Sequence, residues 1–382
     1  MAQISRRAVM LGVVGVGLAA CSKRSPQPST PPTPPPPPSS LPSAPPSPAP
    51  SVDMRPRWPL TGKLVRKEGK AHRAAVAVKV PDNRREHPQR GIDKADIVFV
   101  QLEGYRDVSG YSGTRLVPVF HSRMTDEVAP VRSIRPVDIP LLSPIHALIG
   151  STGAAPWVVN YAKRYRAHIE GLLSYMNTRG TGSYGIDRSR VYTLNGDNYY
   201  DKAVICHPAI LAKQTKRFRS GPPQPYFPFA LTRKEVSARQ GKCGRSIKIP
   251  YQGDSYFMGY EYDNESRRYL RSMPWGPHVV ADGTRVSTDN VLVIKAKQHY
   301  GKIFRGGGHD EPLHDIINAR GKFYYFNRGR YVMGTWRKGK VHEPFEFTLK
   351  DGSPLKMAPG QTFVELPNVG TKLRIEARSK SS

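Results

Sequence analysis

Residues 95–122, ADIVFVQLEGYRDVSGYSGTRLVPVFHS, decide the fold of the N-terminal part of the chain. Two β-branched, apolar segments within this stretch, at 95–102 and 115–122, predict strands bounded by turn residues. AAVAVKV (74–80) predicts a third strand and ALIGSTG (147–153) a fourth. The last of these ends in small residues, as strands that enter a functional loop often do. The stretch and its neighbours therefore predict a core of strands.

Helical periodicity follows at 155–168 and again at 199–216. From about residue 245 onward, five segments separated by turns predict antiparallel β structure: SIKIPYQ, SYFMGYEYD, VLVIKAKQ, GKFYYFNRGRYVMGTW and QTFVELP. The fold class expected is α+β. An α/β-like N-terminal domain (58–240) would precede a β-rich antiparallel C-terminal domain (245–370), with a basic, disordered tail at 371–382.

The first 21 residues have the features of a targeting segment. SRRAVMLGVVGVGLAAC pairs Arg6 and Arg7 with an apolar run, 8–20, that is too short for a transmembrane helix and fits a signal peptide. LAAC resembles a bacterial lipobox, which would make Cys21 the lipidated first residue of the mature protein. The twin arginines indicate Tat export, with Sec export or a simple cleaved signal as the alternatives.

The composition of residues 22–57 predicts a disordered, proline-rich tether. PPTPPPPPSSLPSAPPSPAP (31–50) favours extended polyproline II, at about 3.1 Å per residue, so the tether would reach on the order of 100 Å. A ligand for proline-recognising domains is the other interpretation. Next to a lipobox, a spacer between membrane and folded domain is favoured.

APVRSIRPVDIPLL (129–142) contains the strongest candidate for a site. Arg132 and Arg135 stand three residues apart between two prolines that restrict the backbone. Two guanidinium forks could clamp one carboxylate or phosphate, and Ser133 could donate to a ligand oxygen. Asp138 and Glu103 could orient the forks. The alternative is that both arginines are structural and pair with Asp96, Glu103 or Asp138.

Several motifs resemble one family in order and spacing. They include WPLTGK, APVRSIRPVDI and HALIGSTGAAPW, and later YDNESRRYLRSMPWGPHVVADGTRVSTDNVLV. Over residues 57–368 the chain is similar to the YerB-type lipoprotein family, the two-part DUF3048 domain. The resemblance implies an envelope lipoprotein and brings no established reaction with it.

The resemblance also indicates further site positions. The family's Asp-Asn falls on Asp82 and Asn83, and its Thr-Arg on Thr114 and Arg115. The family pattern has paired glutamates after the 95–102 strand, whereas Glu103 stands alone here. A mechanism that needs two paired carboxylates is therefore not expected for this member.

Other catalytic and metal patterns are weak. No Gly-x-Ser-x-Gly, His-Glu-x-x-His or phosphate loop occurs, and SPLK (353–356) lacks the partner motifs of penicillin-recognising enzymes. The segment CHPAI is typical of a helix in which Cys206 is a buried, structural thiol. Cys206 could also form a disulfide with Cys243. GGGHDEPLHD (306–315) offers metal-competent groups but predicts a solvated loop. We expect no cofactor and no metal.

Charge indicates the kind of partner. The 382 residues carry 59 Lys+Arg against 30 Asp+Glu, a net charge of +29, which attracts polyanions.

The primary hypothesis is a membrane-anchored lipoprotein on the extracytoplasmic face that binds an anionic wall polymer or lipid headgroups through its arginine cluster. No specific nucleic-acid partner is expected. The alternatives are an enzyme on wall polymers, with Glu103 or Asp138 as acid/base, and a non-catalytic envelope scaffold. The empty motif searches favour the absence of catalysis.

Overall fold

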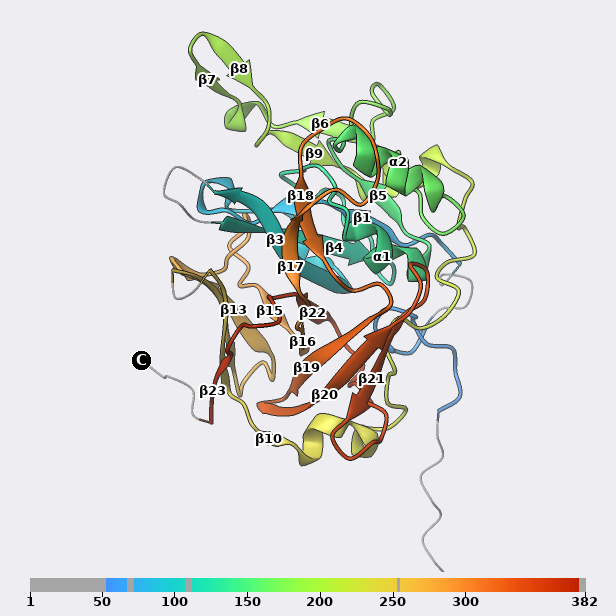
Figure 1. Cartoon of the computed structure of the whole chain (residues 1–382), viewed down its shortest axis with the longest axis vertical. Helices are drawn as coiled ribbons and strands as arrows, with labels where there is room; N and C mark the ends of the chain where they lie inside the picture. Colours follow the sequence, from blue (N-terminus) through green and yellow to red (C-terminus); the bar gives the residue numbers. More distant parts are fainter. Residues whose placement is uncertain (1–52, 67–71, 107–111, 253–254, 378–382) are drawn as a thin grey trace, which may run out of the picture. The chain divides into compact units, whose positions relative to one another are not determined.

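The computed structural model describes residues 53–66, 72–106, 112–252 and 255–377, all within one compact unit that spans 52–382. The expected leader, Cys21 and most of the tether lie outside the described residues. Among the described residues, eleven strands form one mixed sheet (Figure 1). Its main path runs β10 (Lys242–Cys243), β20 (Arg330–Lys338), β19 (Ala319–Asn327), β16 (Asn290–Ile294), β22 (Thr362–Glu365), β3 (Ile97–Arg106), β4 (Ser112–Phe120), β1 (Val76–Val78) and β5 (Leu148–Gly150). Strand β2 (Val80–Pro81) pairs with β4, and β21 (Phe345–Leu349) pairs with β20.

A second sheet of six described strands packs beside the first. Its order is β14 (Gly276–Pro277), β13 (Tyr269–Met273), β12 (Tyr256–Tyr262), β11 (Ser246–Gln252) and β23 (Arg374–Glu376), and β15 (Ser287–Thr288) pairs with β13. Three two-stranded ribbons complete the β structure: β6 (Tyr184–Ile186) with β9 (Val204–Cys206), β7 (Tyr192–Leu194) with β8 (Asp197–Tyr199), and β17 (Gln298–Gly301) with β18 (Glu311–His314).

The described helices are few and short. The α-helices are α1 (Asp138–Leu142), α2 (Pro156–Arg164) and α3 (Pro208–Leu211). The 3₁₀ turns are η1 (Arg84–Glu86), η2 (Ile92–Lys94), η3 (Ser143–Ile145), η4 (Arg188–Arg190), η5 (Ala212–Gln214), η6 (Arg233–Glu235) and η7 (Ser237–Gln240).

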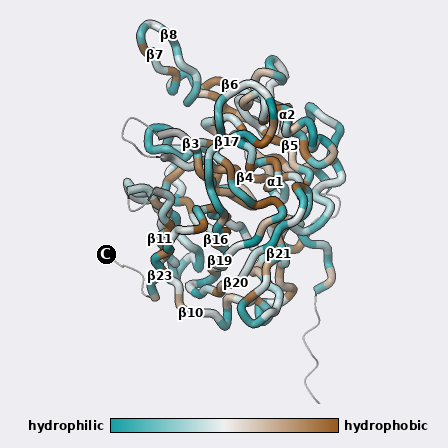
Figure 2. Tube along the Cα trace, viewed as in Figure 1, coloured by the Kyte–Doolittle hydropathy of each residue, from teal (hydrophilic) through white to brown (hydrophobic). Residues whose placement is uncertain are grey.

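Strand β3 lies inside the large sheet and is buried on both faces. Ile97 and Phe99 belong to a core cluster that also contains residues of α1 and α2. Val98 and Val100 belong to a second cluster, shared with β11 and β12. Burial on both faces explains why the strand reads as a continuous apolar run rather than an alternating one. Figure 2 shows the same concentration of hydrophobic residues along β4, β5 and α1.

The predicted α+β, β-rich fold class is confirmed, and the strands expected at 74–80, 95–102, 115–122 and 147–153 are present. The C-terminal region was expected to be purely antiparallel, but it is not. Strand β22 pairs in parallel with β16 on one side and with β3 on the other. The large sheet is therefore built from both sequence regions, and their division into two domains stays a prediction.

Three local expectations were wrong. Residues 199–216 do not form one helix, because β9 and the short α3 occupy this stretch. The loop expected at 306–315 ends in β18, whose residues are buried. The tail expected from 371 contains β23, which pairs with β11. Each of these segments contains a strand that pairs with another strand (β9 with β6, β18 with β17 and β23 with β11), and a local pattern does not reveal such pairing.

Candidate functional site

Most of the predicted site residues lie in one largely buried group of polar and charged side chains, which we call the polar network. It comprises Lys79, Asn83, Glu86, Glu103, Arg115, Arg132, Arg135, Asp138 and Glu311. These residues come from the flanks of β2, from η1, β3 and β4, from the segment before α1 and the first residue of α1, and from β18. Pairing of β3 with β4 and of β2 with β4 brings their ends together.

Glu103 forms its ion pair with Arg115. Both Nε and Nη2 of Arg115 donate to Glu103 Oε1 at 3.1 Å. Asn83 donates to the other oxygen of Glu103. Arg115 Nη1 also donates to the carbonyl oxygen of Ser133 at 2.7 Å, which ties the arginine-containing loop to β4.

Arg132 contacts two carboxylates, neither of which was predicted. Its Nη2 pairs with Glu86 and, at 2.9 Å, with Asp201. Burial raises the pKa of Glu86, while the charge of Arg132 opposes that rise. The Arg132 side chain keeps 20% of its surface exposed.

Arg135 is buried against Glu311 of β18. Its Nε lies 3.0 Å from Glu311 Oε2, and both side chains are at most 3% exposed. The same Nε donates to the main-chain oxygen of Glu103, and the amide of Arg135 donates to Asp138 Oδ2 at 2.6 Å. This ion pair joins β18 to the loop before α1.

Asp138 has a lysine as its charged partner. Lys79 Nζ lies 2.9 Å from Asp138 Oδ1, and neither side chain is exposed. Gln101 donates to the same carboxylate oxygen. Burial lowers the pKa of Lys79 to about 7. Our sequence analysis missed Lys79, although a lysine within the apolar run AAVAVKV was a visible signal.

The structure thus corrects the prediction of one anion held by both arginines. Arg132 and Arg135 contact different carboxylates, on different elements. The alternative, structural ion pairing, matches the geometry, but its predicted partners were wrong. Asp96 instead accepts main-chain N–H groups of His121 and Ser122, at 2.8 and 2.6 Å. The hydroxyl oxygen of Ser133 lies 3.1 Å from that of Thr152.

Asp82 belongs to an adjoining cluster beneath the second sheet. It accepts from Thr114 Oγ1 at 2.9 Å and pairs with Arg271 at 2.7 Å. His87 and His278 offer ligand atoms that all lie within 4.8 Å of one another and of Asp82. Burial opposes ionisation of Asp82, but the charge of Arg271 holds the pKa of that carboxyl well below its usual value.

This cluster does not favour a metal ion. Arg271 Nη1 lies 2.6 Å from Nδ1 of His278, so a guanidinium already occupies the side on which a cation would bind. Burial and the Arg271 charge lower the pKa of His278 well below its usual value. The neutral ring instead pairs its Nε2 with Gln89 at 2.8 Å.

A cavity of about 390 Å³, which we call the rim cavity, opens next to the Glu86 end of the polar network. Four basic side chains line it (Arg85, Arg90, Arg190 and Lys202), together with His87, Pro88, Asp187, Ser189, Val191, Tyr192 and Ala281. Arg190 Nη2 donates to the main-chain oxygen of Glu86 at 2.7 Å, which links the rim cavity to the Arg132 pair. Asp187 is neutralised by Arg90 at 2.6 Å.

Other candidates from the sequence do not assemble into sites. Cys206 is buried in β9 and Cys243 is exposed in β10, and both are free thiols. Burial raises the pKa of Cys206, which disfavours the nucleophilic thiolate. Within SPLK, Ser353 donates to Asp351 and Lys356 pairs with Glu235 at 3.1 Å. The serine and lysine are therefore engaged elsewhere.

Comparison with known proteins assigns the family. The profile of the N-terminal domain of DUF3048, a protein family of unknown function, matches residues 60–196, and that of its C-terminal domain matches residues 247–364. The chain belongs to the DUF3048 family. A Bacillus subtilis (strain 168) protein named "Putative lipoprotein YerB" is 24% identical over 318 residues, which cover 81% of this chain and 85% of that protein.

A solved structure supports the fold of this DUF3048 protein. The crystal structure of the YerB protein from Bacillus subtilis matches with a TM-score of 0.63 at 21% identity, over 84% of this chain and 100% of that one. Within the described part of the chain, no helix has the length and apolarity needed to cross a membrane.

Proposed function

We propose that this DUF3048 protein is a lipid-anchored protein of the cell envelope. Cys21 would carry the anchor, and the folded part would stand on the extracytoplasmic face and bind an anionic wall polymer or lipid headgroup. Support for the anchor comes from the LAAC sequence before the tether and from the name of the Bacillus relative. The net charge of +29 favours anionic partners.

The observation that carries the binding proposal is the charge of the rim cavity. Its lining holds four basic side chains and one carboxylate, and Arg90 already neutralises that carboxylate. An anion that enters would meet Arg85 and Lys202 with Arg132 close by. In this proposal the residues of the rim cavity contact the ligand, and Arg132 lies behind them, paired with Glu86 and Asp201.

Aromatic side chains next to the rim cavity add a surface for stacking. Tyr192 and Tyr199 of the β7–β8 ribbon stack with ring centroids 5.3 Å apart, and both are more than a third exposed. Lys202 Nζ lies 4.5 Å from the centroid of the Tyr192 ring. Rings with one exposed face pack well against sugar or lipid groups that carry the charge. Wall polymers or lipid headgroups that carry both a negative charge and a sugar or apolar group fit this side of the rim cavity.

Catalysis on the same polymers is less well supported by the geometry. Asp138 is completely buried against Lys79, and Glu103 is 5% exposed and bound by Arg115. An acid/base group must come within hydrogen-bonding distance of the reacting atom. Neither carboxylate has that access to a polymer.

Co-sedimentation with purified wall sacculi tests the binding proposal. Residues 52–382 would be mixed with sacculi, with and without their anionic polymers, across a salt series. We expect Arg85→Glu/Lys202→Glu to weaken the binding that wild type retains at moderate salt. The control Arg166→Glu/Arg219→Glu changes charge equally at exposed residues outside the rim cavity and should still bind. Equal loss in both variants would contradict a site at the rim.

Fractionation of cells that express the full chain tests the anchor. We expect Cys21→Ala to move the protein from the membrane fraction to the soluble exported fraction, because the lipidated thiol is lost. Membrane retention of the variant would contradict anchoring through Cys21.

A further inference from the structure

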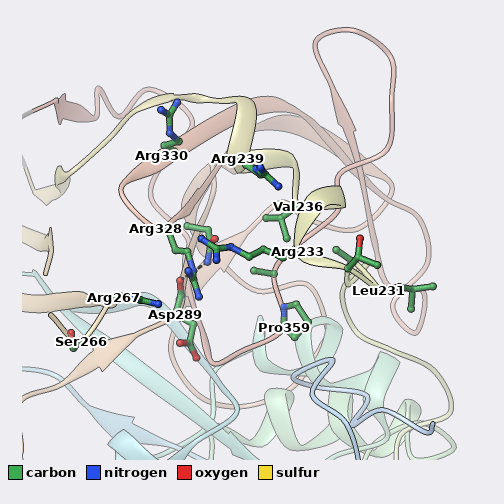
Figure 3. A pocket seen from close by; sticks show the side chains of 14 residues that line it. Leu231, Arg233, Val236, Arg239, Ser266, Arg267, Asp289, Arg328, Arg330 and Pro359 are labelled. Carbon is green, nitrogen blue, oxygen red and sulfur yellow. Dashed lines mark hydrogen bonds between the residues drawn. The ribbon is translucent and has the colours of Figure 1, made fainter. Parts of the chain in front are cut away.

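A second cavity, of about 540 Å³, lies away from the polar network, and we call it the arginine pocket. Five arginines line it (Arg233, Arg239, Arg267, Arg328 and Arg330), with Asp289 as the one acidic residue of its lining. They come from η6, η7, the β12–β13 turn, the β19–β20 turn and the start of β20. Figure 3 shows Arg233, Arg267 and Arg328 converging near Asp289, whereas Arg330 points away from this group.

The arginines of this pocket are not neutralised by carboxylates. Among the described residues, none of the five forms an ion pair, and Arg330 donates only to the main-chain oxygen of Gly241, at 2.9 Å. Asp289 is engaged from its other side by Arg268 at 3.1 Å and by Lys63 at 3.7 Å. The pocket therefore presents an excess of positive charge to solvent.

Two of these arginines have an unfavourable backbone conformation. Arg267 has φ 57° and Arg328 has φ 50°, in the left-handed region that side chains other than Gly, Asn and Asp rarely adopt. Arg328 and Gly329, both with positive φ, form the two-residue turn between β19 and β20, where Asn-Gly is the preferred pair. Local strain that a better turn residue would relieve is typical of functional positions.

The basic surface extends beyond the arginine pocket. A neighbouring cavity of about 1100 Å³ shares Pro359 with it and is lined by Arg268, which also contacts Asp289. Five further basic residues line that cavity (Arg55, Arg57, Lys63, Arg66 and Arg123), against two acidic ones, Asp93 and Asp96. Asp96 is already bonded to the main chain. A ligand with charges at repeated intervals fits this surface better than a single small anion.

We propose that the arginine pocket binds a phosphodiester polyanion, with a phosphate group held by Arg233, Arg267 and Arg328. Planar guanidinium forks suit phosphate oxygens, and several forks around one group neutralise it without a metal. The volume lies in the range of small-ligand sites and accommodates one phosphate with its attached alcohol. The neighbouring cavity then receives the next units of the chain. This site is independent of the rim cavity and of the function proposed for it.

Calorimetric titration with a poly(glycerol phosphate) oligomer tests the site. Residues 52–382, the compact unit, would be compared with Arg267→Asn/Arg328→Asn, since Asn tolerates positive φ and the fold should be kept. We expect at least about a tenfold loss of affinity at moderate salt, because charge-assisted contacts are removed. The slope of log affinity against log salt should become shallower by about 1 to 2. The thermal midpoint should stay the same or rise.

The control Arg166→Asn/Arg219→Asn removes the same charge from exposed positions that do not line the pocket. It should lose no more than about twofold in affinity, the size of a bulk-charge effect. Equal losses in both variants would overturn the proposal. So would equal binding of polygalacturonate, a polyanion that carries carboxylates instead of phosphates.

Phosphatidylglycerol vesicles present the same diester in a lipid headgroup. Binding to the oligomer alone, lost in the pocket variant, would support a polymer as the source. Binding to vesicles that the pocket variant also loses would support the site with a headgroup as its source. Binding to either probe that ignores the pocket variant would contradict the assignment.

Discussion

Arg135 in the polar network and Arg328 in the arginine pocket carry the same guanidinium group in opposite surroundings. Arg135 is 3% exposed and paired with the equally buried Glu311. Arg328 is exposed, has a strained backbone and has no carboxylate partner among the described residues. The first arrangement stabilises contacts between distant strands, while the second leaves a charge available to a ligand. A prominent arginine motif in a sequence is therefore a weaker sign of binding than an arginine whose charge is left uncompensated.

The largest effect on stability should follow from breaking the Arg135 pair. Among the described residues, Arg135→Met leaves the buried Glu311 carboxylate with His309, at 3.2 Å, as its charged neighbour. We expect a loss of about 3–5 kcal/mol in the free energy of unfolding, measured by urea denaturation. Arg135→Met/Glu311→Leu removes both charges and should recover most of that loss. A single variant as stable as wild type would refute a structural role for Arg135.

The next largest effect on stability should come from the buried carboxyl group of Glu365. Glu365 accepts from Tyr260 at 2.5 Å and Tyr251 at 2.8 Å, and burial raises its pKa from 4.5 to about 7. The folded protein keeps a proton that the unfolded chain releases above pH 4.5. Stability should therefore fall as pH rises from about 4.5 to about 7, by about 3 kcal/mol.

Denaturation of Glu365→Gln between pH 4 and 8 isolates this contribution. The variant cannot ionise at this position, so the difference between wild type and variant should change across that window and level off above pH 7. A difference that stays constant from pH 4 to 8 would show that Glu365 has an ordinary pKa.

The smallest effect on stability is expected from a change in the arginine pocket. Arg328→Gly places the residue that best tolerates positive φ at the turn, next to Gly329. We expect the free energy of unfolding to rise by up to about 1 kcal/mol, by the same denaturation assay. A loss of more than about 1 kcal/mol would mean that Arg328 stabilises the fold, and the contrast with Arg135 would disappear.

Much of the fold could be predicted from local pattern. The apolar runs at 95–102 and 361–367 correctly indicated β3 and β22. Their parallel pairing could not be foreseen, since about 260 residues separate them and alternation says nothing about which strand lies beside which. The stretch around Cys206 was misread because a short buried strand and a buried helix segment look alike in periodicity.

Several residues singled out from the sequence come together in the structure, but their partners could not be foreseen. The family resemblance pointed to Arg115, Arg132 and Arg135, and the structure places all three in the polar network. Glu86 lies 46 residues from Arg132, and Glu311 lies 176 from Arg135, so only folding reveals the pairs. The arginine pocket had one local signal, the NRGR turn, where arginine replaces a residue suited to positive φ.

Side-chain NMR of arginine Nε–H groups during titration with the glycerol phosphate oligomer tests the central contrast most directly. Both groups of arginines are observed in one sample, so differences in folding or bulk charge between variants do not enter. We predict that the resonances of Arg233, Arg267 and Arg328 shift in a saturable way, while that of the buried Arg135 stays unchanged. Saturable shifts of Arg135 with unmoved pocket resonances would contradict the account.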